Sequence, residues 1–258
     1  MFLTTSAGAR LEYVRQPGSG LAPTIVMLHE GLGSISMWRD FPQRVADTTG
    51  HSVVAYSRQG YGRSSPLAAP RSERFMHDEA LVVLPQVLDA LEIRRPILLG
   101  HSDGGSIALI HAGGSGREVA GLVLLAPHVM VEDVSIASIA QARSAYAQGD
   151  FRARLGRHHD DVDGAFRGWN DVWLRPEFRG WSIEEYLPQI TCPVLAIQGE
   201  EDEYGTMEQV DRIGRAIPHA RILKLARCGH SPHRDRAEDV LEAIRGFVGG
   251  VLMADQPG

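Results

Sequence analysis

The segment from Gly100 to Gly104 reads Gly-His-Ser-Asp-Gly and places Ser102 between two glycines. It follows the apolar run 97–99 and precedes a stretch with apolar residues at helical spacing, so the Gly-x-Ser-x-Gly pattern lies between a strand and a helix. A turn of this kind strains the serine backbone, requires small neighbours and lifts the hydroxyl to the start of a helix, whose dipole favours an anion. The segment therefore predicts that Ser102 is a nucleophile.

A serine hydroxyl is a weak nucleophile at neutral pH and needs a base to accept its proton and an acid to orient that base. His230 lies in a Cys-Gly-His-Ser-Pro segment after the stretch 221–225, and Asp202 lies in a Gly-Glu-Glu-Asp-Glu segment after the run 194–197. Both loops leave the carboxyl ends of expected strands, the edge at which Ser102 also emerges. The pattern predicts a triad of Ser102, a carboxylate such as Asp202, and His230, in that chain order.

Other carboxylates compete with Asp202 for the role of the acid. Glu200, Glu201 and Glu203 flank it in the same loop, and Asp133 follows the preceding expected strand. Residue types and spacing alone leave this choice open, because each of these carboxylates follows the carboxyl end of an expected strand.

The segment 158–163 contains two adjacent histidines and three aspartates, which raises the possibility of a metal site. Neighbouring residues on a helix point about 100° apart, so the pattern favours a solvated helix face over a set of ligands. Cys192 and Cys228 lack the paired spacing of a zinc or redox motif and are expected to be free thiols. We expect no metal and no cofactor.

Short apolar runs bounded by Gly and Pro alternate with helix-length segments, and these are the elements that must position the triad. Runs without polar alternation are typical of strands buried on both faces, so the pattern predicts an α/β fold with a mostly parallel, doubly wound sheet. The expected strands are 25–28, 53–56, 97–99, 122–126, 194–197 and 221–225, with an edge hairpin from 2–5 and 11–14. The expected helices are 75–91 with a kink at Pro85, 102–112 and 236–247.

The alternation of strands and helices breaks between residues 128 and 188, where amphipathic stretches are rich in Arg, Asp and Trp. We expect a helical lid here, inserted into a single core formed by 1–127 and 189–258. In one interpretation Trp169, Trp173 and Trp181 fasten this lid to the core; in the alternative, Trp169 or Trp173 lines an apolar or aromatic acyl pocket above Ser102. His101 is a further candidate for a pocket wall.

The composition excludes several classes of protein. The chain has 258 residues, of which 43% are hydrophobic and 22% charged, as in an ordinary globular protein. Its net charge is −6, and the 25 Arg and single Lys are scattered among 32 acidic residues, which argues against nucleic acid as a partner. No signal peptide or run of about 18 apolar residues is visible, so we expect a cytoplasmic protein without a membrane partner. Residues 254–258 are expected to fray.

Four landmarks together resemble the α/β-hydrolase-fold serine hydrolases. Residues 29–33 are similar to the His-Gly-x-Pro-Gly oxyanion loop, and 57–64 are similar to the Asp-x-Arg-Gly-x-Gly-x-Ser loop. Residues 100–104 resemble the nucleophile elbow, and the loops of Asp202 and His230 complete the set. The resemblance covers nearly the whole chain and implies the α/β-hydrolase fold with an inserted lid.

The resemblance also implies roles for individual residues. The backbone N–H groups of Gly31 and Asp103 would form the oxyanion hole, and the family's Gly-x-x-Asp pattern selects Asp202 as the acid. Glu30 departs from the pattern, which has glycine there. Its carboxylate either turns away to pair with a cation such as Arg58 or Arg39, or it contacts the substrate.

By the same resemblance, the expected reaction is hydrolysis of a small-molecule ester or lactone through an acyl-enzyme on Ser102, as in carboxylesterases and enol-lactonases. Alternatives on the same triad are carbon–carbon bond hydrolysis of ring-cleavage products and cleavage of thioesters or N-terminal peptide bonds. Perhydrolysis and a non-catalytic role as a small-molecule receptor are further alternatives, because one fold hosts many functions. The oligomeric state is left open.

Overall fold

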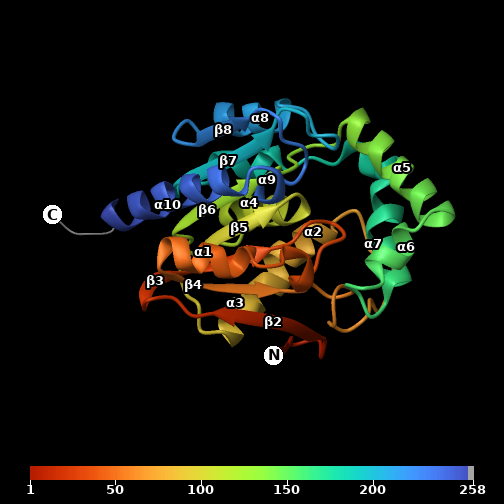
Figure 1. Ribbon diagram of the computed structural model, residues 1–258, viewed down its shortest axis with the longest axis horizontal. Coiled ribbons are helices and arrows are strands. Elements are labelled where there is room, and N and C mark those ends of the chain that lie inside the picture. The colour runs from red at the N-terminus through yellow and green to blue at the C-terminus, as the bar shows by residue number, and fades with distance from the viewer. Residues whose placement is uncertain (255–258) are drawn as a thin grey trace.

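A computed structural model describes residues 1–254 of the chain, and 255–258, part of the expected frayed end, lie outside the described residues. Its centre is one eight-stranded sheet with the order β1-β2-β4-β3-β5-β6-β7-β8 (Figure 1). The strands are β1 (Phe2–Thr4), β2 (Arg10–Gln16), β3 (Leu21–Leu28), β4 (His51–Tyr56), β5 (Ile97–His101), β6 (Gly121–Leu125), β7 (Val194–Gly199) and β8 (Arg221–Leu225). The sequence prediction of an α/β-hydrolase fold with a mostly parallel sheet is confirmed.

Strands β3 to β8 are parallel to their neighbours, and only β1 and β2 run antiparallel. The expected hairpin is present at one edge, with Leu3 opposite Leu11. Because β3 to β8 are parallel, the loops after them all open at one edge of the sheet, where ligands bind in open α/β folds. The loop of residues 29–33, the Ser102 turn and the loops of Asp202 and His230 leave this edge.

Helices cover both faces of the sheet, and alternate strand residues feed two separate apolar layers. The helices outside the segment between β6 and β7 are α1 (Phe41–Thr49), α2 (Phe75–Asp78), α3 (Leu84–Ala90), α4 (Asp103–Gly114), α8 (Glu208–Ala216), α9 (Pro232–Asp235) and α10 (Ala237–Ala254), with the 3₁₀ turn η1 (Ile35–Trp38). Ile25 and Met27 pack with α1 and α10, whereas Val26 and Leu28 pack on the opposite layer with α3, α4 and α8.

The expected helix 75–91 is divided into three parts. A π-helical turn, η2 (Glu79–Val83), separates α2 from α3, and Pro85 stands in the first turn of α3. Proline lacks an N–H and clashes with the preceding turn of a regular helix, so a local change in hydrogen bonding is the expected response. The predicted kink therefore takes the form of a π-helical turn just before the proline.

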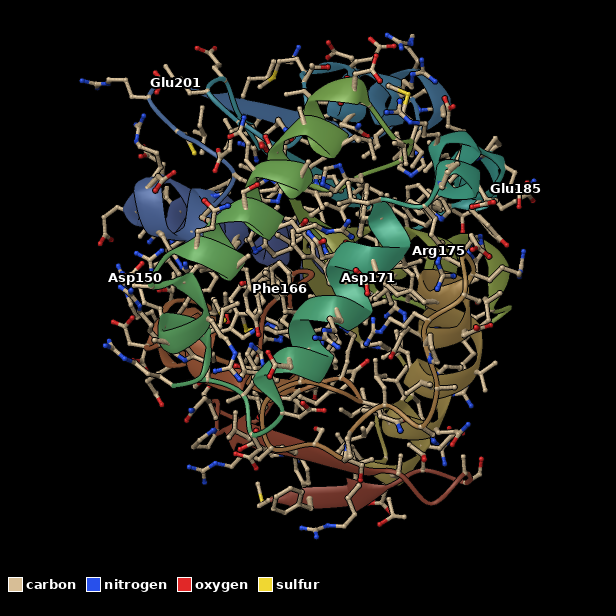
Figure 2. The ribbon with its side chains drawn as sticks, turned by 90° about the vertical axis from the view of Figure 1, so that its right-hand side faces the viewer. Asp150, Phe166, Asp171, Arg175, Glu185 and Glu201 are labelled. Atoms are coloured by element: carbon tan, nitrogen blue, oxygen red, sulfur yellow. The ribbon has the colours of Figure 1, made fainter. Side chains whose placement is uncertain are left out.

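The chain between β6 and β7 forms an arm of helices at one end of the sheet (Figure 1). Its elements are α5 (Asp133–Gln148), α6 (Phe151–Leu155), α7 (Val162–Trp173), η3 (Pro176–Gly180) and η4 (Glu184–Gln189). A single β-bridge joins Met130 to Ser182 and brings the two ends of the arm together. Phe166 lies between α5 and α7 (Figure 2), where its ring stacks on Tyr146 with centroids 3.7 Å apart.

The interpretation of 158–163 as a solvated face is wrong for His159, which is buried. Its Nδ1 accepts the Gly62 N–H at 2.9 Å, and its Nε2 donates to the Leu32 carbonyl at 2.9 Å. The ring thus ties the helical arm to two loops of the core. Across residues 1–254, no three His, Cys, Asp or Glu side chains are grouped as metal ligands, and both cysteines are free.

Candidate active site

Ser102 occupies a strained turn between β5 and α4, with φ 53° and ψ −119°. Such backbone angles are rare for residues with a side chain and cost free energy, so the surrounding structure must hold them. Both glycines of the motif are needed because main-chain atoms of other residues lie too close to leave room for a side chain. A Cβ on Gly100 would lie 2.5 Å from the carbonyl carbon of Gly104, and one on Gly104 would lie 2.5 Å from that of Leu28.

Ser102, His230 and Asp202 meet at the carboxyl edge of the sheet. His230 Nε2 lies 2.9 Å from Ser102 Oγ, and His230 Nδ1 lies 2.8 and 2.9 Å from the two carboxylate oxygens of Asp202. A carboxylate only accepts hydrogen bonds, so Nδ1 carries the hydrogen and Nε2 is free to accept the serine proton. The geometry suits a nucleophile, a base and an orienting acid.

The charges of the pair favour this arrangement. Burial lowers the pKa of His230, but the hydrogen bond to Asp202 and the negative charge of that carboxylate outweigh burial and raise the pKa above its ordinary value. Burial raises the pKa of Asp202, and the contact with His230 more than reverses this, so the carboxylate stays ionised. The imidazole is thereby made a stronger base.

Asp202 is held by its own loop and by β7. Its Oδ1 accepts the N–H of Tyr204 at 2.8 Å and that of Gly205 at 3.2 Å, while Oδ2 accepts from Gln198 Nε2 at 2.8 Å. Two of the competing acids have other partners, and Glu200 and Glu201 are exposed. Asp133 is 95% exposed and pairs with Arg179, and Glu203 accepts the main-chain N–H of His230 rather than its ring.

The backbone N–H groups of Gly31 and Asp103 are unpaired in the part of the chain that the structure describes, and both residues line the cavity that contains Ser102. Unpaired donors beside the nucleophile can bind a developing oxyanion. The carboxylate of Asp103 is fully buried, and its nearer oxygen lies 3.9 Å from Arg58 Nη2.

The peptide between Glu30 and Gly31 is fixed by three hydrogen bonds to its carbonyl oxygen. The donors are Arg58 Nη2 at 2.8 Å, His29 Nδ1 at 2.7 Å and Gly33 N–H at 3.1 Å. The C=O and N–H of a trans peptide point in opposite directions. The hydrogen bonds to the carbonyl therefore also fix the direction of the Gly31 N–H.

A cavity of about 110 Å³ opens at Ser102. The predicted residues Gly31, His101, Ser102, Asp103, Trp169, Trp173 and His230 all line it, and Asp202 lies behind His230. Six further residues line it: Glu30, for which contact with the substrate was one alternative, and Leu32, His128, Ile139, Tyr204 and Ser231, which were not among the predicted site residues. A volume of this size holds several water molecules, and therefore a short acyl group.

Two of the additional residues flank the imidazole of His230. The rings of His128 and Tyr204 lie 5.6 and 4.8 Å from it, centroid to centroid. Burial, followed by the charge of His230, lowers the pKa of His128 to about 3, so this ring stays neutral. Both residues follow the carboxyl ends of strands, β6 and β7, which is the sequence signal that could have identified them.

Glu30 takes neither of the cation partners that were considered for it. Its Oε2 lies 3.4 Å from Nδ1 of His101, and the contact of Arg58 is with the main-chain oxygen of Glu30. The expectation of an Arg58 or Arg39 pair is wrong, because the side chain turns toward the elbow and lines the cavity.

Sequence comparison defines the class of protein that this fold and site form. A model described as the alpha/beta hydrolase family matches residues 25–243. The chain therefore belongs to the alpha/beta hydrolase family. Within residues 1–254, no helix is long and apolar enough to cross a membrane.

Individual relatives are hydrolases with different substrates. The sn-1-specific diacylglycerol lipase ABHD11 of Xenopus laevis is 26% identical over 92% of this chain and 83% of its own. A 2-hydroxy-6-oxononadienedioate/2-hydroxy-6-oxononatrienedioate hydrolase of Cupriavidus pinatubonensis is 26% identical over 90% of this chain and 88% of its own. The enol-lactonase of Burkholderia xenovorans superposes with a TM-score of 0.75, at 21% identity, over 96% of this chain and 100% of its own.

Proposed function

We propose that this hydrolase cleaves a small-molecule carboxylic ester or lactone through an acyl-enzyme on Ser102. The observation that supports this most strongly is the continuous set of hydrogen bonds from Ser102 Oγ through His230 to Asp202, at 2.9 and 2.8 Å. The unpaired N–H groups of Gly31 and Asp103 on the same cavity add an oxyanion site. These are the groups that acyl transfer requires.

In the proposed mechanism, His230 takes the proton of Ser102 as Oγ attacks the carbonyl carbon. Asp202 holds the imidazole in the required tautomer and stabilises the imidazolium. Gly31 and Asp103 donate hydrogen bonds to the oxyanion. His230 then protonates the leaving oxygen, and in the second half it activates water, which releases the acid and restores the serine.

The helical segment 128–188 is proposed to act as a lid. Trp169 and Trp173 of α7 form part of the cavity wall, and a Cβ on Gly31 would overlap the Trp169 indole. The lid thus approaches the oxyanion loop to within van der Waals contact. We infer that these two indoles limit the acyl group that can enter and exclude water during the reaction.

Carbon–carbon bond hydrolysis is a second reaction for the same triad, and one relative is a hydrolase of dienedioates and trienedioates. Glu30 lines the cavity beside Ser102 and carries a carboxylate whose pKa lies well below its usual range. A substrate with two carboxylates would meet a like charge there, which is unfavourable in a buried site. The site therefore favours a neutral ester or lactone.

The proposal is tested with a panel of p-nitrophenyl esters, lactones, thioesters and vinylogous diketones. We expect turnover of short esters or lactones, with Ser102→Ala and His230→Ala each lowering kcat by about 10⁴-fold or more. Because the two residues act as a unit, the double variant loses little more than either single variant. Losses that add, or turnover confined to diketones, would contradict the proposal, and absence of any turnover would favour a receptor.

A further inference from the structure

Glu30 and His101 form a second carboxylate–imidazole contact beside the triad. Nδ1 of His101 faces Glu30 Oε2 at 3.4 Å, and Nε2 of the same ring lies 2.7 Å from the main-chain carbonyl oxygen of His230. A carbonyl oxygen only accepts, so Nε2 donates this hydrogen bond. The ring therefore links the oxyanion loop to the loop that carries the base.

The surroundings of His101 hold its ring in place. The side chain is 2% exposed, and the rings of Trp38 and His233 lie 6.2 and 4.9 Å from it. Both groups that face its nitrogens, a carboxylate and a carbonyl, are acceptors. The ring therefore lies between two acceptors and holds the nearer one, the His230 carbonyl, by the hydrogen bond from Nε2.

The Glu30 carboxylate is suited to this role. Burial would raise its pKa, but the hydrogen bond and charge of His101, followed by the charges of His29 and His233, hold it well below the usual range. Its side chain is 17% exposed, so part of it faces the cavity while Oε2 faces His101. The carboxylate is thus ionised within the site.

We propose that Glu30 and His101 are positioning residues that fix the main chain of His230 and, through the charge of Glu30, strengthen its imidazole as a base. The inference rests on the proposed function of the triad and goes beyond it, because neither residue touches the reacting atoms in that mechanism. The inference assigns a role to Glu30, which stands where the family pattern has glycine.

The charge of Glu30 acts on His230 together with several other groups. Asp202 contributes most to raising the pKa of His230 against burial, followed by Glu203 and Glu30. The titratable groups that face His230 from the surrounding elements are Glu30, His101, Asp103, His128, Asp202, Glu203, Tyr204 and His233. Loss of the Glu30 charge alone should therefore shift the titration of His230 without abolishing it.

The test uses the full chain and measures the rate at which a fluorophosphonate labels Ser102 across the acidic and neutral pH range. This reaction needs the Ser102–His230 pair but no particular ester. For Glu30→Gln we expect the acid limb of the rate to move to lower pH by about 0.3 unit or more, because a negative charge near the imidazole is removed. The labelling rate at the plateau should also fall by about 3- to 10-fold, because the support of His230 is weakened.

A matched control removes one carboxylate from an exposed position. Glu201 lies in the loop of Asp202, is exposed, and stands at the edge of the molecule in Figure 2. Glu201→Gln should leave the plateau rate and the acid limb unchanged. An equal shift in both variants would overturn the inference, because it would show an effect of net charge rather than of the Glu30 site.

His101 supplies a second pair of variants. His101→Gln retains an amide donor that can reach the His230 carbonyl, whereas His101→Met fills similar space without a donor. We expect the plateau rate to fall by about tenfold in His101→Met and to be largely restored in His101→Gln. Equal rates in the two variants, at equal thermal stability, would overturn the positioning role.

The outcomes separate this inference from the proposed function. If the unmodified chain is not labelled at Ser102, the proposed function fails. If it is labelled and hydrolyses esters while Glu30→Gln keeps the plateau rate and acid limb of the unmodified chain, only the second carboxylate–imidazole pair is refuted.

Discussion

Gly31→Ala should disable the proposed oxyanion hole through a steric conflict with Trp169 of the proposed lid. The added Cβ would lie 3.0 Å from Cε2 of the Trp169 indole and would overlap Nε1 and Cδ1 of the same ring. Carbon atoms in contact settle at about 3.5–4.0 Å, so the indole or the Gly31 peptide must move by on the order of 1 Å. A 1 Å misplacement in an active site costs about 10²-fold, and loss of one oxyanion donor costs about 10²–10³-fold in kcat. We therefore expect kcat to fall by about 10²-fold.

The assay is steady-state hydrolysis of p-nitrophenyl acetate by Gly31→Ala, Trp169→Ala and the double variant. Because Trp169→Ala removes the overlapping ring, the double variant should recover about tenfold relative to Gly31→Ala, and the cycle should show strong coupling. Gly180→Ala is the control, since an added Cβ there meets no atom within 4 Å. Unchanged kcat in Gly31→Ala would refute the role of its N–H, and additive effects would refute the steric explanation.

Asp202→Asn should lower kcat by about 10³–10⁴-fold because it disturbs the tautomer and orientation of His230, whereas Asp133→Asn should change kcat little. If steady-state kinetics gave the opposite result, Asp133, which follows β6, would be the acid of the triad. His230 must be neutral to accept a proton, and its pKa is raised, so kcat/KM should be lost as pH falls through a value above about 6.5. If the acid limb of the pH profile of kcat/KM lies at or below that value, the electrostatic account is contradicted. Trp173→Ala should change the ratio of kcat/KM between short and long or aromatic acyl esters by about tenfold. If the ratio stays the same while the urea midpoint falls, Trp173 only fastens the lid.

Much of the fold could be predicted because its signals are local. Strand β8 begins and ends at the residues that its apolar pattern predicts, and the turn at Ser102 is encoded by its two flanking glycines. The loops of Asp202 and His230 follow strands, so the topology of a parallel sheet brings them to one edge. Their contact with Ser102 could therefore be expected without knowledge of side-chain positions.

The features that sequence did not reveal depend on contacts between distant segments. The direction of the Glu30 side chain depends on His101, 71 residues further along the chain. His159 is buried because its ring bonds to two core loops, which no helical pattern can indicate. The rings of His128 and Tyr204 meet at His230 only after β6, β7 and β8 have paired.

The most direct test of the account is detection of the acyl-enzyme. The chain is mixed with p-nitrophenyl acetate, quenched at short times, and analysed by intact mass and peptide mapping. The account predicts a burst of p-nitrophenol and a transient gain of one acetyl group on the peptide that contains Ser102, which decays as turnover proceeds and is absent in Ser102→Ala. Sustained ester turnover with the acetyl group on another residue, such as Cys228, or undiminished turnover by Ser102→Ala, would contradict it.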